Sequence, residues 1–356
     1  MIVIFAAAAR VKGYNHCRLP VNVIVASQNV LDDHFERATV QYRKQQNNLL
    51  ILLLASSWAL AEYKSRLTSS GTCVTRIRSS VNLPYCVNPV RDNIINNMGG
   101  AASSILQRCA LWDVGIQWAM WAVSSAFQTE RFYDAAGSGT FAFLAVKSFQ
   151  WGAVRNKRQT IQTSLVVVWA ARLFLFLFTR ILLEGHDKRF KNVRDNPKVF
   201  FIYWTVQALW IFLTLLPTLM LNAEKKEVAL GPRDYIGWAI YGTGLFLESV
   251  SDYQKSAFKA NPDNAGKFIT SGFWSFSRHP NYLGEIMVWT GLYISASSVL
   301  SGWQHIGVIS PLFVYFLLTR VSGIPMLEKM GMKRWGNDPN YLEYVKKTPV
   351  LFPSLW

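Results

Sequence analysis

The chain has 356 residues, of which 51% are hydrophobic and only 16% are charged, and its formal net charge is +16. Soluble domains contain about 25% charged residues, so the composition argues against an ordinary soluble domain. It also shows no soluble basic domain of the kind that binds nucleic acid. Low charge density with a basic excess is typical of a multi-pass membrane protein with cationic loops.

Residues 1–104 differ from the rest of the chain. They contain scattered polar runs such as QYRKQQNN and no regular apolar periodicity. The opening MIVIFAAAAR is a weak match to a signal peptide, because its charge follows the apolar run instead of preceding it. An apolar run at 49–61 is shorter than the ~20 residues that a membrane helix needs. We therefore expect a poorly ordered basic extension over 1–104 and a membrane domain over 105–356.

The membrane domain contains a series of apolar segments. The clearest are TSLVVVWAARLFLFLFTRILL and VFFIYWTVQALWIFLTLLPTLML, each long enough to cross a bilayer. The predicted spans lie at 110–127, 139–154, 163–183, 199–221, 235–251, 283–300 and 306–324. The sequence thus predicts an all-α, polytopic membrane helix bundle of about seven transmembrane helices.

Lys and Arg are distributed unevenly between the two sides of this bundle. The loops at 184–198 and 252–282 and the C-terminal segment are more basic than the loops at 155–158 and 222–234. Because short basic loops face the cytosol, we expect the C-terminus on the cytosolic side. The basic residues of 1–104 would then lie on the opposite side, but long segments carry little weight in this rule.

The cysteines and histidines show no metal centre. Cys17, Cys73, Cys86 and Cys109 form no CxxC pair and precede the predicted spans. His279 has no second His or Cys at ligand spacing. We expect idle thiols and no bound metal.

The hexapeptide GSGTFA at 137–142 matches the G-x-G-x-x-A pattern of dinucleotide-binding loops. It follows QTERFYDAA instead of a strand, and no acidic residue occurs between Asp134 and Glu184 to bind a ribose. We therefore expect a turn between the first two spans, where glycine supplies positive φ angles.

Ionisable residues inside predicted spans are costly in lipid and mark either ion pairs or functional sites. Arg172 and Arg180 lie eight residues apart, on roughly one face of the third span. Glu248 and Asp252, four residues apart, share a face at the end of the fifth span. One interpretation is that such residues, for example Arg172 and Glu248, pair only to stabilise the bundle.

A second polar group lies in SRHPNYLGE (277–285), directly before an apolar run. Here Pro280 fits the first turn of a helix, and Asn281 and Glu285 lie four residues apart. The polar residues expected near one cytosolic face are Glu248, Asp252, Lys255, Lys259, Arg278, Asn281, Glu285 and Arg320. Arg and Lys match phosphates, whereas Asn and carboxylates match amide and hydroxyl groups. The set therefore indicates a polar ligand of nucleotide type.

These segments resemble a known family. ESVSDYQKSAFKANPDNAGKFITSGFWSFSRHPNYLGEIMVWTGLYI resembles the C-terminal core of the steroid 5-alpha-reductase superfamily, and is most similar to its DUF1295 branch. PMLEKMGMKRWGNDPNYLEYVKKTPVLFP, QTERFYDAAGSGTF and WAARLFLFLFTRILLEGHDKRF continue the resemblance, which covers about 105–356. It implies seven membrane helices in the endoplasmic reticulum and NADPH bound from the cytosol. The implied reaction is reduction of an activated C=C bond in a lipid-soluble substrate such as a steroid, a sterol or another enone lipid.

The resemblance also implies site residues. Those placed around NADPH are Arg172, Glu248, Asp252, Lys259, Arg278, Asn281, Tyr282, Glu285 and Arg320. Glu130, in QTERFYD, is implied as a catalytic residue near the substrate carbonyl, where negative charge develops and a proton must arrive. Trp169 occupies the position of a family tyrosine, so we expect Tyr133 to substitute for it.

Two alternatives remain open. SRHPNY is similar to the RHP-x-Y element of isoprenylcysteine methyltransferases, which implies S-adenosylmethionine as the cofactor. The number of basic residues favours NADPH, which carries several phosphate charges. Trp169 leaves a third interpretation, a catalytically idle membrane scaffold of the same fold.

Overall fold

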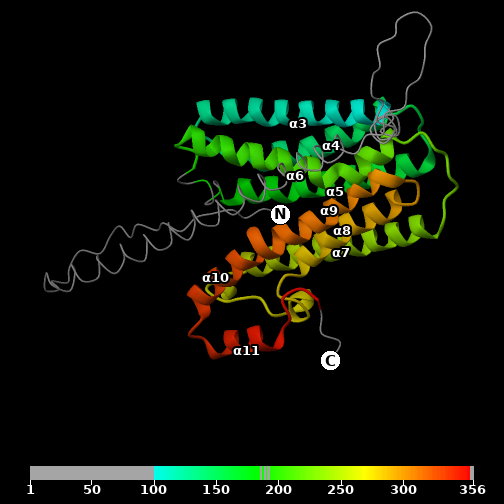
Figure 1. Ribbon diagram of the computed structural model, residues 1–356. Coiled ribbons are helices and arrows are strands. Elements are labelled where there is room, and N and C mark those ends of the chain that lie inside the picture. The colour runs from blue at the N-terminus through cyan, green and yellow to red at the C-terminus, as the bar shows by residue number, and fades with distance from the viewer. Residues whose placement is uncertain (1–99, 185–186, 188–189, 191–192, 353–356) are drawn as a thin grey trace, which may run out of the picture. The chain divides into compact units, whose positions relative to one another are not determined.

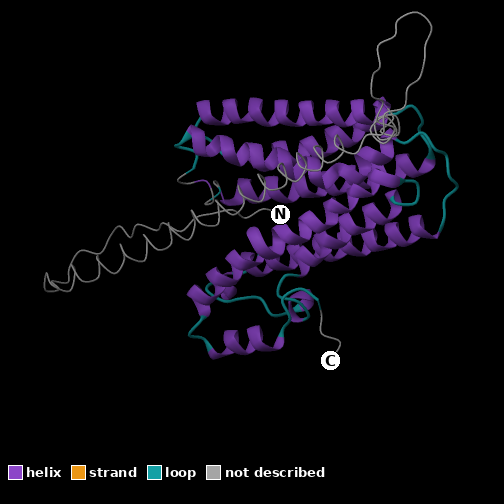
Figure 2. Ribbon diagram, in the orientation of Figure 1, coloured by secondary structure: helices purple, strands orange, loops and turns teal. Residues whose placement is uncertain are grey.

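The computed structural model describes residues 100–352, except 185–186, 188–189 and 191–192, and all regular elements in this part are helical (Figure 2). The all-α prediction is confirmed for these residues. The predicted extension up to about residue 100, the apolar run at 49–61 and three of the four cysteines (Cys17, Cys73 and Cys86) lie outside the described residues.

Six of the predicted spans each overlap one long helix, and the seventh, at 306–324, runs over several consecutive shorter helical elements (Figure 1). The long helices are α3 (Gly100–Ala126), α4 (Tyr133–Trp151), α5 (Lys157–Glu184), α6 (Pro197–Ala223), α7 (Pro232–Ala260) and α8 (Pro280–Ala296). The shorter elements are η2 (Pro262–Asn264), η3 (Gly272–Ser275), η4 (Gly302–Val308), α9 (Ile309–Phe316), the π-helical turn η5 (Leu317–Val321), α10 (Ile324–Trp335) and α11 (Pro339–Lys347). Proline stands in the first turn of several of these helices, including Pro280 in α8 as predicted, because its missing N–H costs nothing there.

Three stretches of the described residues are long and apolar enough to cross a membrane: Lys157–Ile181, Pro197–Ala223 and Gly302–Trp335. Large apolar side chains such as Leu111, Phe127 and Phe246 are exposed, which suits contact with lipid. These features are consistent with membrane embedding. The count of seven spans and the cytosolic C-terminus remain predictions.

The expected turn at 137–142 is wrong, because α4 begins at Tyr133 and GSGTFA lies inside it. Glycine is required at position 137 because a neighbouring helix approaches closely there, and not because the backbone adopts a positive φ angle. A Cβ atom at this position would lie 2.9 Å from Nε2 of Gln207 on α6. The same Nε2 donates hydrogen bonds of 3.0 Å to the Gln117 side chain and to the Tyr133 carbonyl, so Gly137 leaves room for a polar link between α3, α4 and α6.

Helices α7 and α8 make the most extensive contact among the described elements. Glycines allow this contact: Gly237 and Gly244 on α7 face Gly291 and Gly284 on α8. A Cβ atom on Gly244 would lie 2.7 Å from the Gly284 carbonyl oxygen, and one on Gly291 would lie 2.4 Å from the Gly237 oxygen. Small residues let membrane helices approach closely. The contact brings the end of α7 beside the start of α8, where the predicted site residues lie.

Helices α5 and α7 run in the same direction, and contacts between them recur at matching positions along both. Near the start of both helices, Arg158 Nε lies 2.6 Å from Asp234 Oδ1. Seven residues further along each helix, the Tyr241 hydroxyl donates a 2.7 Å hydrogen bond to the Leu165 carbonyl. Both pairs are separated by 76 residues in the sequence. A further step of seven residues leads to the candidate site.

Candidate functional site

A buried ion-pair cluster joins α5 to α7 seven residues beyond the contact between Leu165 and Tyr241. Arg172 Nη1 lies 2.6 Å from Glu248 Oε1, and Arg172 Nη2 binds both Asp252 and, at 3.2 Å, the Glu248 carbonyl oxygen. The predicted Arg172–Glu248 pairing is confirmed. Two carboxylates thus share one guanidinium, so the formal charges of this cluster do not balance.

Two further side chains complete this cluster. Trp169 Nε1 donates a 3.2 Å hydrogen bond to Glu248 Oε2, and Asn281 Nδ2 of α8 donates one of 3.1 Å to Asp252 Oδ1. Glu248 and Asp252 are buried, whereas Asn281 is half-buried. We call Trp169, Arg172, Glu248, Asp252 and Asn281 the Arg172 cluster. Sequence reasoning did not find the role of Trp169 in it, because an indole in an apolar run resembles any other core residue.

Residues of α8 extend this cluster by one turn. Glu285 is buried and lies close enough to Arg172 to interact with it electrostatically. Tyr282 is also buried, and its ring stacks on that of His279 with centroids 5.6 Å apart and planes 8° from parallel. The four-residue spacing of Asn281 and Glu285 therefore does turn both towards α5 and α7.

Arg278 and His279 make a separate contact with α10. Arg278 Nη1 and His279 Nε2 both bind the Glu328 carboxylate, the latter at 2.7 Å. Burial lowers the pKa of His279, and the Glu328 hydrogen bond opposes this only in part, so the imidazole is neutral at pH 7. Arg278 Nε and His279 Nδ1 are buried without a hydrogen-bond partner. Glu328 was missed by sequence reasoning, because it lies 50 residues from Arg278.

The remaining predicted basic residues stay outside the Arg172 cluster. Lys259 is exposed on α7, and Arg320 is exposed in the π-helical turn η5. Lys255 Nζ lies 4.4 Å from the centre of the Trp274 ring. Burial and the neighbouring Lys259 charge lower the pKa of Lys255 to about 8. Lys255 therefore carries a positive charge at neutral pH that it loses under mildly basic conditions.

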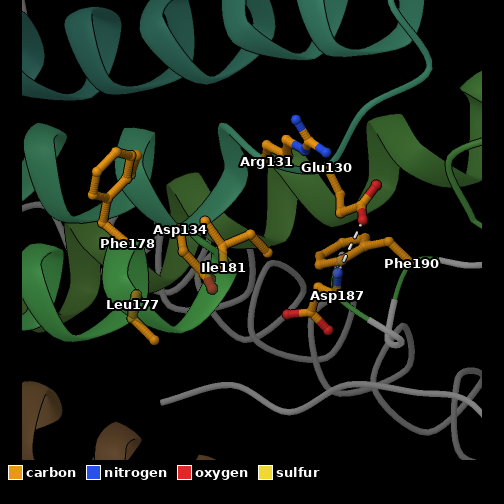
Figure 3. Close-up of a pocket in the computed structure, with 9 residues that line it drawn as sticks. Glu130, Arg131, Asp134, Leu177, Phe178, Ile181, Asp187 and Phe190 are labelled. Atoms are coloured by element: carbon orange, nitrogen blue, oxygen red, sulfur yellow. Dashed lines mark hydrogen bonds between the residues drawn. The ribbon is translucent and has the colours of Figure 1, made fainter. Parts of the chain in front are cut away.

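A small pocket lies further along α5 (Figure 3). Its lining residues are Glu130, Arg131, Asp134, Ala135, Leu177, Phe178, Ile181, Asp187 and Phe190. The three from α5 follow Arg172 by five to nine residues, or about 7–14 Å along the helix axis at about 1.5 Å per residue. The pocket and the Arg172 cluster therefore follow each other along one helix.

Glu130 is buried at the edge of this pocket. Its Oε1 accepts a 3.0 Å hydrogen bond from the Asp187 backbone N–H, drawn as a dashed line in Figure 3, and its Oε2 lies 3.2 Å from Arg194 Nη1. Arg180 lies 3.0 Å from the Asp134 carboxylate and 3.1 Å from that of Asp187. The polar side of the pocket therefore consists of charged groups held in place by ion pairs.

Tyr133 is placed differently from Glu130. Its hydroxyl donates a 3.0 Å hydrogen bond to the Tyr203 carbonyl, and its buried ring packs on Phe190 and Trp204. It does not line the pocket. To act as a donor to a substrate, Tyr133 would have to exchange this carbonyl for a new partner.

Among the described residues, no group of three or more His, Cys, Asp or Glu side chains is arranged to hold a metal ion. The acidic residues of the two regions are matched instead by arginines, a tryptophan and an asparagine. These side chains can supply hydrogen bonds, charge and protons to a ligand.

The model of the family described as "Protein of unknown function (DUF1295)" matches residues 120–348, which is more than half of the chain. The chain belongs to this family, and the resemblance found in the sequence is confirmed.

Individual relatives are more distant. An uncharacterised protein of Schizosaccharomyces pombe is 25% identical over 232 residues, covering 57% of this chain and 65% of the relative. A probable O-methyltransferase of Ustilaginoidea virens is 30% identical over 113 residues, covering 32% and 38%. The steroid 5-alpha-reductase DET2 of Solanum lycopersicum is 29% identical over 121 residues, covering 34% and 42%. Each match spans less than two thirds of the relative's length. No solved structure matches the chain.

Proposed function

We propose that this protein is an NADPH-dependent reductase of an activated C=C bond in a lipid-soluble substrate. The observation that carries the proposal is the Arg172 cluster with the Glu130 pocket beyond it on α5. Similarity to a steroid 5-alpha-reductase supports the reaction class. The proposal includes cytosolic entry of the cofactor, seven spans and residence in the endoplasmic reticulum membrane, with substrate entering from the bilayer.

The residues present fit the proposed cofactor. Asn281 and the carboxylates of Glu248 and Asp252 match the hydrogen-bonding groups of an amide and of ribose hydroxyls. Lys255, with no ion pair to a carboxylate in the described part of the chain, can meet a phosphate, as can the unpartnered Nε of Arg278. Exposed Lys259 and Arg320 extend the positive charge outwards. Tyr282 and Glu285 are proposed to line the same site.

When bound, NADPH would supply the hydride for such a reduction. The protein would then have to stabilise the negative charge that develops on the carbonyl oxygen and deliver one proton to the α-carbon. Glu130 is proposed to act at the carbonyl end, because it is buried at the pocket edge and held by Arg194. Tyr133 is proposed as the second donor after it leaves the Tyr203 carbonyl.

A second candidate is a methyltransferase that uses S-adenosylmethionine. The similarity to a probable O-methyltransferase favours it. Two carboxylates around one guanidinium also suit a cationic cofactor as well as they suit hydroxyl groups. Lys255, Lys259 and Arg320 have no role in that reaction, since S-adenosylmethionine carries no phosphate. We therefore prefer the reductase. A catalytically idle scaffold is the third possibility that the experiment must separate.

The test is a thermal-shift measurement on the full chain purified in detergent, with NADPH, NADH and S-adenosylmethionine as separate ligands. Stabilisation by NADPH above NADH is the expected result and supports the reductase. Stabilisation by S-adenosylmethionine alone would overturn it in favour of the methyltransferase. No stabilisation by any of the three, in protein shown to be folded, would leave the idle scaffold as the better explanation.

A further inference from the structure

The loop between α7 and α8 contains the short turn η3 (Gly272–Ser275), which is attached to the end of α7. The Phe273 backbone N–H donates a 3.0 Å hydrogen bond to Oε1 of Gln254, and the indole N–H of buried Trp274 donates one of 3.1 Å to the Ser251 carbonyl. The loop therefore has a fixed position relative to the last turns of α7.

These attachment points lie at the end of a predicted membrane span, which covers 235–251 of α7. The ring of Phe273 packs edge to face on that of Phe246, with centroids 6.1 Å apart. Phe246 precedes the end of the span by five residues, or about 7–8 Å at a rise of about 1.5 Å per residue. The turn η3 therefore lies beside the end of the span and not beyond it.

The outer side of this region is aromatic. Phe246, Tyr253 and Phe276 keep 62%, 72% and 63% of their surface exposed. Tyr253 follows Phe246 by seven residues, so both lie on one face of α7. Phe276 follows Phe273 by three residues, and side chains at this spacing in a 3₁₀ turn lie one above the other. We call Phe246, Tyr253, Phe273 and Phe276 the aromatic patch.

The spacing of tyrosines along α7 indicates what covers the aromatic patch. Tyr235, also exposed, lies on the same face of α7 as Phe246 and precedes it by three turns. Tyr235 and Tyr253 are 18 residues apart, or about 27 Å at about 1.5 Å per residue, close to the ~30 Å hydrocarbon thickness of a bilayer. Tyrosine is enriched at both membrane–water interfaces. Tyr253 therefore marks one interface, and exposed Lys259, a further six residues along, lies at the level of the lipid headgroups.

We propose that η3 is a membrane-inserted loop, and that the aromatic patch lies in the interfacial region of the cytosolic leaflet with lipid as its partner. This inference rests on the fifth span and the cytosolic side given under the proposed function, but on no cofactor and no reaction. The ring of Trp274 also lies 4.4 Å from Lys255 Nζ. The loop thus holds this part of the candidate site at the membrane surface.

The test measures the membrane depth of single side chains. A nitroxide spin label is attached to one introduced cysteine in the full chain, reconstituted in phosphatidylcholine–phosphatidylserine vesicles. Its collision rate with oxygen, which concentrates in lipid, is divided by that with a water-soluble nickel chelate present on both sides. Cys109 is fully buried and stays in place, and the other three native cysteines are replaced by serine.

Phe276→Cys is the decisive variant, and its exposed side chain can be replaced with little loss of packing. Two controls define the scale. Leu175→Cys reports lipid, because Leu175 is exposed within the long apolar stretch of α5. Lys267→Cys reports water, because Lys267 is exposed in the same α7–α8 loop as η3. Phe246→Cys and Tyr253→Cys measure the depth of α7 itself.

We expect the oxygen-to-nickel ratio of Phe276→Cys to exceed that of Lys267→Cys by at least about fivefold and to lie within about twofold of Phe246→Cys. Tyr253→Cys should fall between Phe276→Cys and Lys267→Cys. A ratio for Phe276→Cys equal to that of Lys267→Cys would overturn the proposal. Low collision rates with both reagents would also overturn it, because protein and not lipid would then cover the aromatic patch.

Failure of the underlying span would look different. A ratio as low for Phe246→Cys as for Lys267→Cys would overturn both the fifth span and the inserted loop. A lipid-like ratio for Phe246→Cys with a water-like ratio for Phe276→Cys would overturn the inserted loop alone. Because no measurement uses NADPH or turnover, failure of the proposed reaction is tested separately.

Discussion

Helices α5 and α7 carry two buried arginine–carboxylate sites that lie two heptads apart. Comparing them suggests how an ion pair that stabilises the bundle differs from one that binds a ligand. At the first, Arg158 binds Asp234 and the carbonyl oxygens of Val228 and Ala229. Asp234 also accepts hydrogen bonds from two serines of the α8 end, Ser295 and Ser298. One charge of each sign is present, and both are almost fully enclosed.

The Arg172 cluster has the opposite character. One guanidinium serves two carboxylates, the Arg172 side chain keeps 17% of its surface exposed, and the members of the cluster come from α5, α7 and α8. A closed, balanced pair stabilises the helix contact and offers no unused hydrogen-bonding capacity. An open, unbalanced cluster beside a pocket is what a ligand site requires. The predictions below test whether this difference in charge balance corresponds to a difference in role.

The largest effect is expected at the balanced pair. Arg158→Met leaves the Asp234 carboxylate buried without its partner, which costs about 3–5 kcal/mol of folding free energy. The measurement is the unfolding midpoint in detergent, together with NADPH affinity of the folded fraction. Arg172→Met is the matched variant: it should lose most of the NADPH affinity, which the folded fraction of Arg158→Met should keep. Similar stability losses with similar NADPH affinities would contradict the division of roles.

The second effect concerns the pocket. Glu130→Gln keeps the shape of the side chain but removes its charge and basicity, and we expect turnover to fall about 100-fold or more with NADPH affinity unchanged. The substrate for this assay is an enone lipid that is first shown to bind the purified protein. Glu227→Gln, on an exposed loop residue, is the control. Full activity of Glu130→Gln would remove Glu130 from the reaction.

The third effect concerns the helix contact that brings Glu248 to α8. Gly244→Ala places a methyl group 2.7 Å from the Gly284 carbonyl oxygen, so α7 and α8 must separate. We expect a loss of about 1–3 kcal/mol in stability and weaker NADPH binding. Gly242→Ala is the control on the same helix, because nothing lies within 4 Å of its added methyl group. That variant should be as stable as the wild type or slightly more so. Equal stability of the two variants would show that the close contact has no energetic importance.

The sequence predicted those features that depend on spacing within one helix. The shared faces of Glu248 with Asp252 and of Asn281 with Glu285 follow from helical periodicity. In the structure Glu248, Asp252 and Glu285 act on Arg172, and Asn281 bonds to Asp252. The approximate positions of the long helices also follow from apolar runs, whereas α10 and α11 were not predicted. These predictions needed no knowledge of how the helices pack.

Contacts between distant helices could not be predicted in the same way. Glu328 meets Arg278 only because α10 folds back over the start of α8, and no local pattern records that approach. The turn expected at GSGTFA failed for a related reason: the close approach of Gln207, and not the local backbone, requires Gly137. Polar partners inside the bundle are set by helix register, which one sequence does not display.

The fourth effect tests the ligand side of the Arg172 cluster. Asn281→Ala removes a hydrogen-bonding amide at the open edge, and we expect about tenfold weaker NADPH binding with little change in unfolding midpoint. Arg320→Ala should likewise weaken NADPH and not NADH if it meets the additional phosphate. Asn340→Ala, on the exposed surface of α11, is the control. Unchanged NADPH affinity in both Asn281→Ala and Arg320→Ala would refute the site assignment.

The smallest effect is a pH dependence. Burial and the Lys259 charge lower the pKa of Lys255 to about 8, so its side chain is charged at pH 7 and neutral at pH 9.5. A neutral amine attracts a phosphate less, and NADPH affinity should therefore fall several-fold as pH rises through about 8. Two neighbouring groups matter for assigning this pH dependence to Lys255. Asp252 raises the pKa of Lys255 and so opposes the effect of burial, and the pKa of His279 is lowered, so His279 does not titrate in this range. Lys255→Arg keeps its charge throughout, so its NADPH affinity should be nearly flat between pH 7 and 9.5. The same fall in both proteins would place the titrating group elsewhere, and the Arg172 cluster would then bind its ligand without help from Lys255.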